Sequence, residues 1–315
     1  MKILLTAINA KYIHSNLAIY SLKASAGEYG GEIELAEYTI NNLKDYILED
    51  IYKRRADVVC FSCYIWNLTY VEEIAREYHK LFPETPIWVG GPEVSYNVED
   101  FLTKHPYITG VMIGEGEAAF RELCGHYSEC RDSENLADID GLAYRAESGA
   151  IVITKNREPI DMSSIPFCYD AMADFSNRIV YYESSRGCPF SCSYCLSSVD
   201  KSLRFRNLDF VKRELLFFIE HKVPQVKFVD RTFNCNHQHA LEIWRFIKEK
   251  DQGITNFHFE ISADLMNQEE LELISDMRPG LIQLEIGVQT TNEVTIREIH
   301  RIMKLDRIKE VVTAI

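Results

Sequence analysis

Short apolar runs alternate with amphipathic stretches over the first half of the chain, and this alternation constrains the fold more than any other feature. Helical periodicity marks residues Asn16–Ala26, Leu43–Arg54 and Val71–Leu81. Between and around them lie five runs rich in β-branched and other apolar residues: Lys2–Ile8, Glu32–Ile40, Asp57–Tyr64, Pro86–Val89 and Tyr107–Ile113. Strands that alternate with helices form parallel sheets, so the sequence predicts an α/β fold with a doubly wound parallel sheet.

Ligands of such sheets bind outside the carboxyl ends of the strands. Here those ends lead into the loops 9–16, 62–67, 90–93 and 114–117. A Gly-x-Gly-x-x-Gly motif does not follow the first strand, which disfavours a dinucleotide. The glycines Gly90, Gly91 and Gly114 would let a bulky ligand approach the backbone closely.

A second series of strand–helix units begins near residue 178. Its predicted strands are Ile179–Glu183, Gln225–Asp230, Phe257–Ser262 and Leu281–Val288, each followed by a helical stretch. Residues 130–175 lie between the two series and contain a predicted hairpin around Glu147-Ser148-Gly149. We therefore expect a domain at 1–129, a connector with a hairpin at 130–175, and a second domain at 176–315.

The first strand of the second series leads into a loop with three cysteines, Cys188, Cys192 and Cys195. Three thiolates can hold a cubane iron–sulfur cluster and leave its fourth iron without a protein ligand, where chemistry can occur. A closed zinc site needs a fourth ligand, and no Cys or His follows before His221. A disulfide framework is disfavoured because the chain has nine cysteines and no signal peptide, which indicates a reducing cytoplasm.

With Tyr194 just before the third cysteine, this loop resembles the signature of the radical S-adenosylmethionine (SAM) superfamily. The resemblance implies a 4Fe-4S cluster on Cys188, Cys192 and Cys195, and reductive cleavage of SAM to a 5′-deoxyadenosyl radical. It also implies an electron donor such as flavodoxin or ferredoxin. By the same resemblance, SAM would contact Tyr194 and polar residues or glycines at the strand ends: Asp230, Thr232, Glu260, Ser262, Glu285, Gly287 and Gln289.

The strand–helix units of the second series resemble the partial barrel of this superfamily, which usually has about six of them. Only four are found before Ile315. The sequence analysis therefore predicts an incomplete barrel, apparently truncated after its fourth unit.

About the first 125 residues resemble the cobalamin-binding domain that precedes the radical SAM barrel in one branch of the superfamily. The Asp-x-His-x-x-Gly motif, whose His ligates cobalt elsewhere, is absent. We expect His14 to hydrogen-bond within its loop and the lower face of the cobalamin to lack a His ligand. The residues that the resemblance places at the cobalamin are Asn9, His14, Ser15, Ser62, Trp66, Gly90, Gly91, Pro92, Gly114, Glu115 and Glu117.

The remaining cysteines, together with His237 and His239, are interpreted as structural. Cys60 and Cys63 form a Cys-x-x-Cys, but residues three apart on a strand point to opposite faces and cannot easily form a disulfide. Cys124, Cys130 and Cys168 show no pattern. Cys235 with His237 and His239 does not converge on one helix face, although Cys235 stays a possible site residue.

The sequence thus predicts a cytoplasmic cobalamin-binding radical SAM enzyme, in the methyltransferase-like branch, that transfers a methyl group to an unactivated carbon of a small molecule or peptide. Alternatives are a methylthiotransferase, which would need a second cluster on Cys60, Cys63 and Cys124, and a non-catalytic iron–sulfur electron-transfer module. Residues 1–174 carry −13 of the net charge of −14, which disfavours nucleic acid as a partner. No apolar stretch approaches the length of a membrane span.

Overall fold

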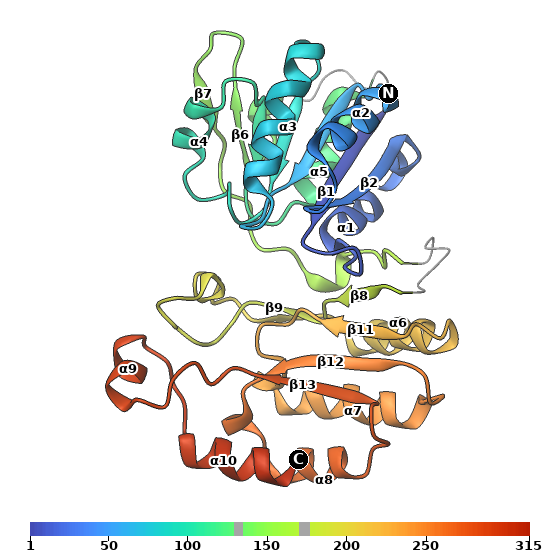
Figure 1. Ribbon diagram of the computed structural model, residues 1–315, viewed down its shortest axis with the longest axis vertical. Coiled ribbons are helices and arrows are strands. Elements are labelled where there is room, and N and C mark those ends of the chain that lie inside the picture. The colour runs from blue at the N-terminus through green and yellow to red at the C-terminus, as the bar shows by residue number, and fades with distance from the viewer. Residues whose placement is uncertain (129–134, 170–176) are drawn as a thin grey trace. The chain divides into compact units, whose positions relative to one another are not determined.

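The computed structural model describes residues 1–128, 135–169 and 177–315 (Figure 1). The chain divides into two compact units. The first, here the N-terminal unit, comprises residues 1–160 and 165–172; the second, the C-terminal unit, comprises 161–164 and 173–315. Cys130 lies outside the described residues. The predicted domain boundaries stay a prediction.

The core of the N-terminal unit is a seven-stranded sheet in the order β2-β1-β3-β4-β5-β6-β7. Its first five strands are parallel, as the alternating sequence predicts. Their order places β1 in the interior, so that the chain winds outward from it in both directions. These strands are β1 (Ile3–Asn9), β2 (Ile33–Thr39), β3 (Val58–Ser62), β4 (Ile87–Gly90) and β5 (Gly110–Met112).

The predicted hairpin extends this sheet. β6 (Leu142–Arg145) pairs antiparallel with β5, and β7 (Ile151–Ile153) pairs antiparallel with β6. The turn between them is closed by a hydrogen bond from the Ala146 N–H to the Ala150 carbonyl, 2.9 Å. The sequence analysis assigns this hairpin to a connector, whereas its backbone hydrogen bonds make it the edge of the N-terminal sheet.

Helices cover both faces of the sheet (Figure 1). One apolar core packs α2 (Lys44–Arg54), α3 (Leu68–Leu81) and α4 (Val98–Lys104) against one face. The other core packs α1 (Leu17–Ser25) and α5 (Glu117–Tyr127) against the opposite face. The short helix α4 was not located from the sequence. Two 3₁₀ turns complete the described part of this unit: η1 (Gly27–Glu32) and η2 (Leu136–Asp138).

Cys60 lies in β3 and Cys63 directly follows this strand. Their side chains point to opposite faces of the sheet, as predicted. Cys60 belongs to the core with α1 and α5, and Cys63 to the core with α2, α3 and α4. Burial raises the pKa of both thiols. They are therefore core residues and not a redox pair.

The C-terminal unit contains a four-stranded parallel sheet in the order β13-β12-β11-β8. The strands are β8 (Ile179–Tyr182), β11 (Gln225–Phe228), β12 (Asn256–Ile261) and β13 (Ile282–Ile286). The helices are α6 (Leu208–Glu220), α7 (His237–Lys250), α8 (Gln268–Ser275), α9 (Glu293–Glu298) and α10 (Leu305–Ala314). Shorter elements are η3 (Met162–Ser164), β9 (Ser185–Arg186), η4 (Leu196–Ser198), β10 (Arg204–Phe205), η5 (Phe233–Cys235) and η6 (Ala263–Leu265).

Aromatic side chains fill the space between this sheet and its helices. Tyr182 contacts Phe218 of α6, with ring centroids 5.8 Å apart, and Phe259 contacts Trp244 of α7 at 5.9 Å. The residues that alternate with them along the strands point to the other face, which is largely polar. The sheet therefore has one fully buried apolar face and one half-buried polar face, here called the open face.

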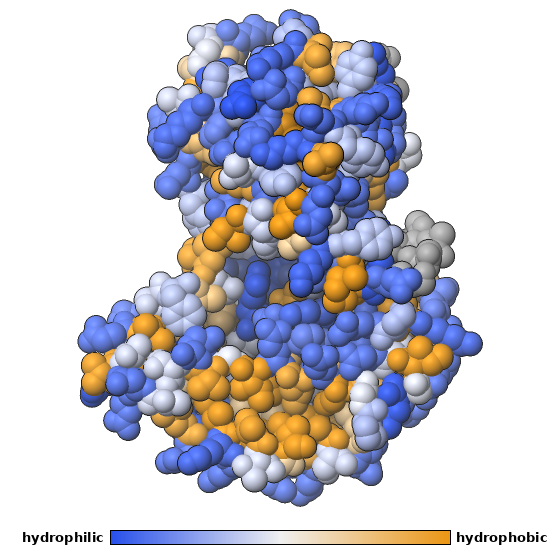
Figure 2. Space-filling view, viewed as in Figure 1, coloured by the Kyte–Doolittle hydropathy of each residue, from blue (hydrophilic) through white to orange (hydrophobic). Residues whose placement is uncertain are grey.

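The strand β13 forms one edge of this sheet. Its alternate residues Ile282, Leu284 and Ile286 are only half-buried. Figure 2 shows a broad hydrophobic area on this unit, in the region of β13, α8 and α10.

Among the residues that the structure describes, no helix has the length and apolar composition needed to cross a membrane.

Candidate functional site

The three-cysteine loop is tied together at its base. Ser185 pairs with Phe205 and Arg186 with Arg204 in the two-stranded β9–β10 sheet, so residues 187–203 form a closed excursion. Gly187 has a φ of +90°, and a Cβ there would lie 2.4 Å from the Ser202 carbonyl oxygen. Only glycine fits where the two ends of the loop approach so closely.

The cysteines lie just beyond this base. The Cys188 N–H donates to the Asp200 carbonyl, 3.0 Å, and the Cys195 N–H donates to that of Cys192, 3.1 Å. The side chains of Cys188 and Cys192 are 7% and 6% exposed, and Cys195 is half-buried. Among the described residues no three His, Cys, Asp or Glu side chains are grouped to hold a single metal ion. Thiolates of a cubane cluster each bind a different iron, so they need not surround a single point.

Arg301 connects the cysteine loop to the end of the last strand. Its guanidinium donates to the Tyr194 hydroxyl, 2.8 Å, and to the Gly287 carbonyl, and lies 3.9 Å from the Cys192 sulfur. Its Nε is buried without a hydrogen-bond partner among the described residues. The sequence analysis missed Arg301 because nothing in its local pattern marks it. It follows α9, where the Ile299 carbonyl accepts a hydrogen bond from the Ser193 N–H, 3.0 Å.

Two predicted SAM residues lie at the end of β11. The Thr232 hydroxyl is 3.8 Å from the Cys188 sulfur. Asp230 has no exposed surface, and its carboxylate accepts hydrogen bonds from Ser184 and Ser185. The predicted contact of Asp230 with SAM is not tested by these bonds and stays a prediction.

Glu260 and Glu285 lie side by side on the open face of the sheet, where β12 and β13 pair them in register. Lys227 of β11 bridges them, with its Nζ 3.3 Å from Glu260 and 2.8 Å from Glu285. The hydrogen bond from Lys227 lowers the pKa of Glu285 below its ordinary value. His258 also contacts Glu285, Nε2 to carboxylate, at 3.0 Å. The predicted carboxylates thus belong to a charged ladder that the sequence did not reveal.

The remaining predicted SAM residues end β12 and β13. Ser262 is held by Asn234, whose amide oxygen accepts from the Ser262 N–H, 3.0 Å. Gly287 offers its carbonyl to Arg301, and Gln289 has a φ of +58°. Thr232 and Gly287 are thereby linked to the cysteine loop, whereas Glu260 and Glu285 are linked to each other.

The basic residues after the loop are paired with acids. Arg204 contacts Asp200, and Lys212 contacts Glu242. Arg206 is buried against Glu214. These pairings neutralise the three cations within the unit.

In the N-terminal unit, a polar network lies at the carboxyl ends of β1 and β3. The Asn16 amide donates to the side-chain oxygens of Asn9, 3.2 Å, and Ser62, 3.4 Å. Asn9 in turn donates to Glu37, 3.1 Å, and to the His14 carbonyl, 3.1 Å. The first loop is therefore fixed against the sheet edge.

Apolar side chains project from the same edge. Tyr12 is 66% and Ile65 is 81% exposed, and Ile13, Trp66 and Tyr96 are also exposed. Trp66 stacks on Tyr64 with ring centroids 4.5 Å apart and an interplanar angle of 4°, and its indole N–H donates to the Ile8 carbonyl, 3.2 Å. Exposed apolar groups around a polar centre are typical of a ligand surface.

Other predicted cobalamin residues have internal partners. A Cβ at Gly91 would lie 2.4 Å from the Cys63 carbonyl oxygen, so the fold itself requires this glycine. Glu115 accepts a hydrogen bond from the Ile160 N–H, 2.8 Å. Glu117 is buried and accepts from Ser21, 3.1 Å. Gly90 and Gly114 leave room beside the backbone. Ser15 is buried, and Pro92 follows Gly91 in the loop after β4.

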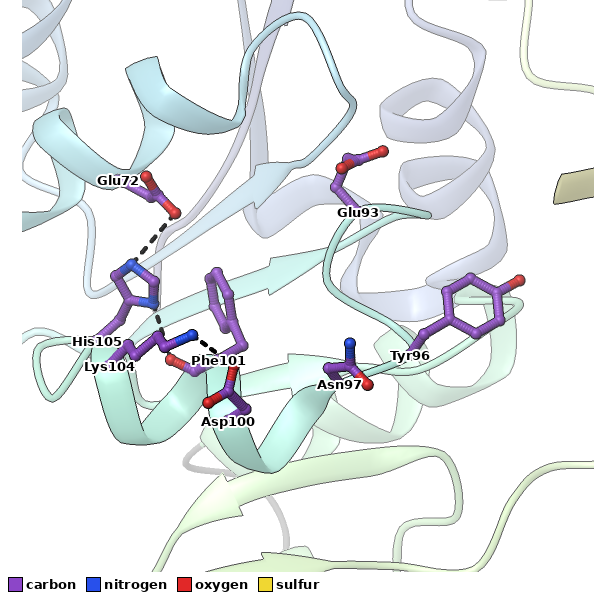
Figure 3. A pocket seen from close by; sticks show the side chains of 8 residues that line it. All are labelled: Glu72, Glu93, Tyr96, Asn97, Asp100, Phe101, Lys104 and His105. Atoms are coloured by element: carbon purple, nitrogen blue, oxygen red, sulfur yellow. Dashed lines mark hydrogen bonds and ion pairs between the residues drawn. The ribbon is translucent and has the colours of Figure 1, made fainter. Parts of the chain in front are cut away.

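A separate cavity of about 250 Å³ lies between α3 and α4 (Figure 3). His105 lies between the Glu72 carboxylate, 3.2 Å from its Nε2, and the Phe101 carbonyl, 2.8 Å from its Nδ1. Figure 3 shows Glu93 and Tyr96 at the other end of this cavity. No cysteine is among the described residues that line this cavity.

Two family models match the chain. Residues 3–124 match the B12 binding domain, and residues 182–315 match the radical SAM superfamily. The first match spans β1 to α5, and the second begins at Tyr182, just before the cysteine loop.

Several curated proteins are similar in sequence. The cobalamin-dependent radical SAM methyltransferase TokK of Streptomyces tokunonensis is 30% identical over 189 residues, 56% of this chain and 28% of TokK. An uncharacterised methyltransferase of Pyrococcus horikoshii is 33% identical over 181 residues, 53% of this chain and 38% of that protein. The anaerobic magnesium-protoporphyrin IX monomethyl ester cyclase of Rubrivivax gelatinosus is 22% identical over 91% of this chain and 53% of the cyclase. The chain thus spans from about a quarter to about half of these relatives.

Solved structures share the fold. The cobalamin-dependent SAM radical enzyme OxsB, with aqua-cobalamin and SAM bound, matches 99% of this chain and 47% of its own with a TM-score of 0.78 and 16% identity. The radical SAM methyltransferase TsrM from Kitasatospora setae, with cobalamin and a [4Fe-4S] cluster bound, matches 100% of this chain and 65% of its own, also with a TM-score of 0.78 and 17% identity.

Proposed function

We propose that the chain, whose residues 3–124 match the B12 binding domain and whose residues 182–315 match the radical SAM superfamily, is a cobalamin-dependent methyltransferase that uses a 4Fe-4S cluster and SAM. The observation that carries this proposal is the pair of cofactor surfaces: a closed loop with three cysteines in one unit, and an exposed aromatic and polar strand edge in the other. The whole-protein activity and the substrate, a small molecule or a peptide, belong to the proposal.

Cys188, Cys192 and Cys195 would hold the cluster. When bound, the cluster would supply the electron for reductive cleavage of SAM, and an external reductant such as flavodoxin or ferredoxin would replenish it. Arg301 supports this assignment because its guanidinium contacts Cys192 and Tyr194 and has a buried Nε without a partner among the described residues. A guanidinium in that place favours an anion, and we propose that it binds the carboxylate of SAM.

The other SAM contacts follow from the strand ends. Thr232 and Gly287 are linked to the cysteine loop by described contacts, and we propose them as the nearest neighbours of SAM. Ser262 and Gln289 end the adjacent strands. Glu260 and Glu285 lie on the open face with Lys227, where they can position polar groups of SAM or substrate and exchange protons with them.

Cobalamin would lie against the carboxyl edge of the N-terminal sheet. A corrin ring has broad and largely apolar faces, which suit the exposed Tyr12, Ile65 and Trp66. Its amide side chains suit the polar network behind them. The proposed surface comprises Asn9, His14, Ser15, Ser62, Trp66, Gly90, Gly91, Pro92, Gly114 and Glu115. We expect no protein His on the lower face of the cobalt.

The methylthiotransferase alternative is disfavoured by the N-terminal cysteines. Cys60 and Cys124 lie in one core and Cys63 in the other, on opposite faces of the sheet. Burial raises the pKa of Cys124 to about 12, so this thiol is a poor metal ligand. A second cluster on these three residues would need the sheet to open.

The proposal is tested by cofactor loading and SAM cleavage. The anaerobically reconstituted protein is mixed with hydroxocobalamin, desalted and examined by visible spectroscopy, and then reduced in the presence of SAM. We expect stoichiometric corrinoid and formation of 5′-deoxyadenosine or S-adenosylhomocysteine.

Cys192→Ala should abolish product formation, and the matched core variant Cys124→Ala should retain it. Turnover by Cys192→Ala at the wild-type rate would refute the cluster assignment. Failure of the folded wild type to retain corrinoid would refute the cobalamin assignment alone.

A further inference from the structure

Asp230 is a fully buried carboxylate that contacts no cation among the residues that the structure describes, and such a group needs several hydrogen bonds to remain buried. Its Oδ2 accepts from the Ser184 N–H, 3.0 Å. Its Oδ1 accepts from the Ser184 hydroxyl and the Ser185 hydroxyl, each at 2.6 Å. Three donors therefore converge on one side chain, and all three belong to two consecutive residues.

Those two residues lead directly into the cysteine loop. Ser184 and Ser185 are themselves buried, and Cys188 lies three residues after Ser185. Ser185 is also the first residue of β9, which closes the base of the loop. A change in the position of these serines would therefore shift the backbone from which Cys188 projects.

The geometry of the sheet brings Asp230 to the serines. Phe228 pairs with Tyr182 in the β11–β8 register, and the Val229 N–H donates to the Tyr182 carbonyl, 2.9 Å. Asp230 lies just after the end of β11, and Ser184 lies just after the end of β8. The carboxylate joins the ends of two neighbouring strands at the point where the loop begins.

A histidine of α7 adds a further hydrogen bond to this network. His239 of α7 lies with its Nε2 3.1 Å from the Ser184 hydroxyl oxygen. That hydroxyl gives its one proton to Asp230, so Nε2–H of His239 is the donor to Ser184. Burial lowers the pKa of His239 to about 4, which is consistent with a neutral ring at neutral pH. Hydrogen bonds thus connect His239 of α7 to Ser184 and Ser184 to Asp230.

We infer that Asp230 is a positioning residue for the cysteine loop: its carboxylate fixes Ser184 and Ser185, and through them the place of Cys188. This role lies behind the loop and differs from a contact with SAM. The inference concerns the protein alone, and only its cluster readouts rest on the proposed function.

The first test needs no cofactor. In the apo-protein, the alkylation rate of the buried Cys188 thiol by iodoacetamide is measured by mass spectrometry in the wild type and in Asp230→Asn. An asparagine can accept at one atom only and loses part of the network. We expect Cys188 in this variant to react about fivefold faster, as the loss of roughly one net hydrogen bond predicts.

Glu270→Gln is the matched control. Glu270 is a second buried carboxylate of the same unit: it accepts from the Asn267 N–H, 2.9 Å, and lies 3.0 Å from His237 Nδ1, and no described contact joins it to the cysteine loop. Its variant should leave the Cys188 rate unchanged. Equal rates in the wild type and Asp230→Asn would overturn the inference. If Asp230→Asn does not fold, Ser185→Ala removes one of the three bonds and should accelerate the same cysteine; an unchanged rate there would also overturn it.

The second test uses the reconstituted protein. We expect Asp230→Asn to show a lower iron content or an altered electron paramagnetic resonance spectrum of the reduced cluster without SAM, while Glu270→Gln matches the wild type. A wild-type spectrum in Asp230→Asn that no longer responds to SAM would indicate a SAM contact and refute the positioning role. A wild type that binds no iron would instead refute the proposed function and leave the alkylation result standing.

Discussion

Arg301 is the residue for which the structure makes the sharpest single-site prediction. Its guanidinium contacts Tyr194 and Gly287 and keeps one buried N–H without a partner among the described residues. We expect Arg301→Ala to weaken SAM binding to the cluster-loaded protein by about tenfold to a hundredfold, the usual range for a lost charge-assisted hydrogen bond. Equilibrium dialysis with labelled SAM measures this change.

The control for this prediction is Arg297→Ala, an exposed arginine one helical turn earlier in the chain. It should bind SAM as the wild type does. Iron content is compared in all three proteins, and a loss of iron in Arg301→Ala would show that the residue acts on the cluster loop and not on SAM.

His239 gives a prediction on pH. Burial lowers its pKa from 6.5 to about 4, so between these values the unfolded chain binds a proton that the folded chain does not. Stability therefore falls as the pH decreases through this window, by about 2 kcal/mol between pH 7 and pH 5 for this group. Urea unfolding at the two pH values, compared with His239→Gln, measures the contribution. Equal pH dependence in both proteins would contradict it.

At the residue scale, the sequence predicted which side chains could bind a cofactor better than it predicted the contacts that those side chains make. The three cysteines are recognisable because their spacing is local, and the separation of Cys60 from Cys63 follows from strand geometry. Arg301 and the Lys227 bridge could not be predicted, because their contacts join residues 14 to 109 positions apart. Sequence patterns contain no direct record of such distant pairs.

At the scale of elements, the strand β13 has an exposed edge and half-buried apolar residues. An uncovered edge of this kind is a template for association. We expect the 315-residue chain to self-associate reversibly in sedimentation velocity experiments. Leu284→Lys should raise the dissociation constant about tenfold or more, since burying one Leu side chain contributes about 1.5–3 kcal/mol.

Val312→Lys, on an exposed position of α10, provides the comparison because it adds the same charge away from the strand. If both variants reduce association equally, net charge and not the strand edge is responsible.

Most strands and helices were predicted because each has a clear apolar period, and their parallel order follows from the alternation. Two elements differ. The seven-residue α4 is too short to show a reliable helical period. The hairpin β6–β7 has a recognisable turn, but its own sequence does not indicate that β6 pairs with β5. Local sequence patterns therefore identify a helix or strand well, but they identify poorly the element against which it pairs or packs.

At the scale of the whole molecule, the chain divides into two compact units, and each unit supplies one of the two candidate cofactor surfaces. The two cofactors should therefore load independently. We expect a variant with Cys188, Cys192 and Cys195 replaced by Ala to lose iron and retain corrinoid. The reverse is expected of Tyr12→Asp combined with Ile65→Asp, because both side chains are exposed and their replacement leaves the core intact.

Visible spectroscopy for corrinoid and colorimetric iron analysis on the same desalted samples measure both quantities. Loss of both cofactors in either variant would show that one surface depends on the other.

The closed base of the cysteine loop has a consequence for how such a protein can diversify. Since β9 (Ser185–Arg186) and β10 (Arg204–Phe205) pair through two residues each, insertions or deletions between Leu196 and Val199 would leave the register of the four-stranded sheet unaffected. The loop can thus accumulate changes over generations while the scaffold is inherited intact. The length of this loop can therefore differ between related proteins that act on different substrates.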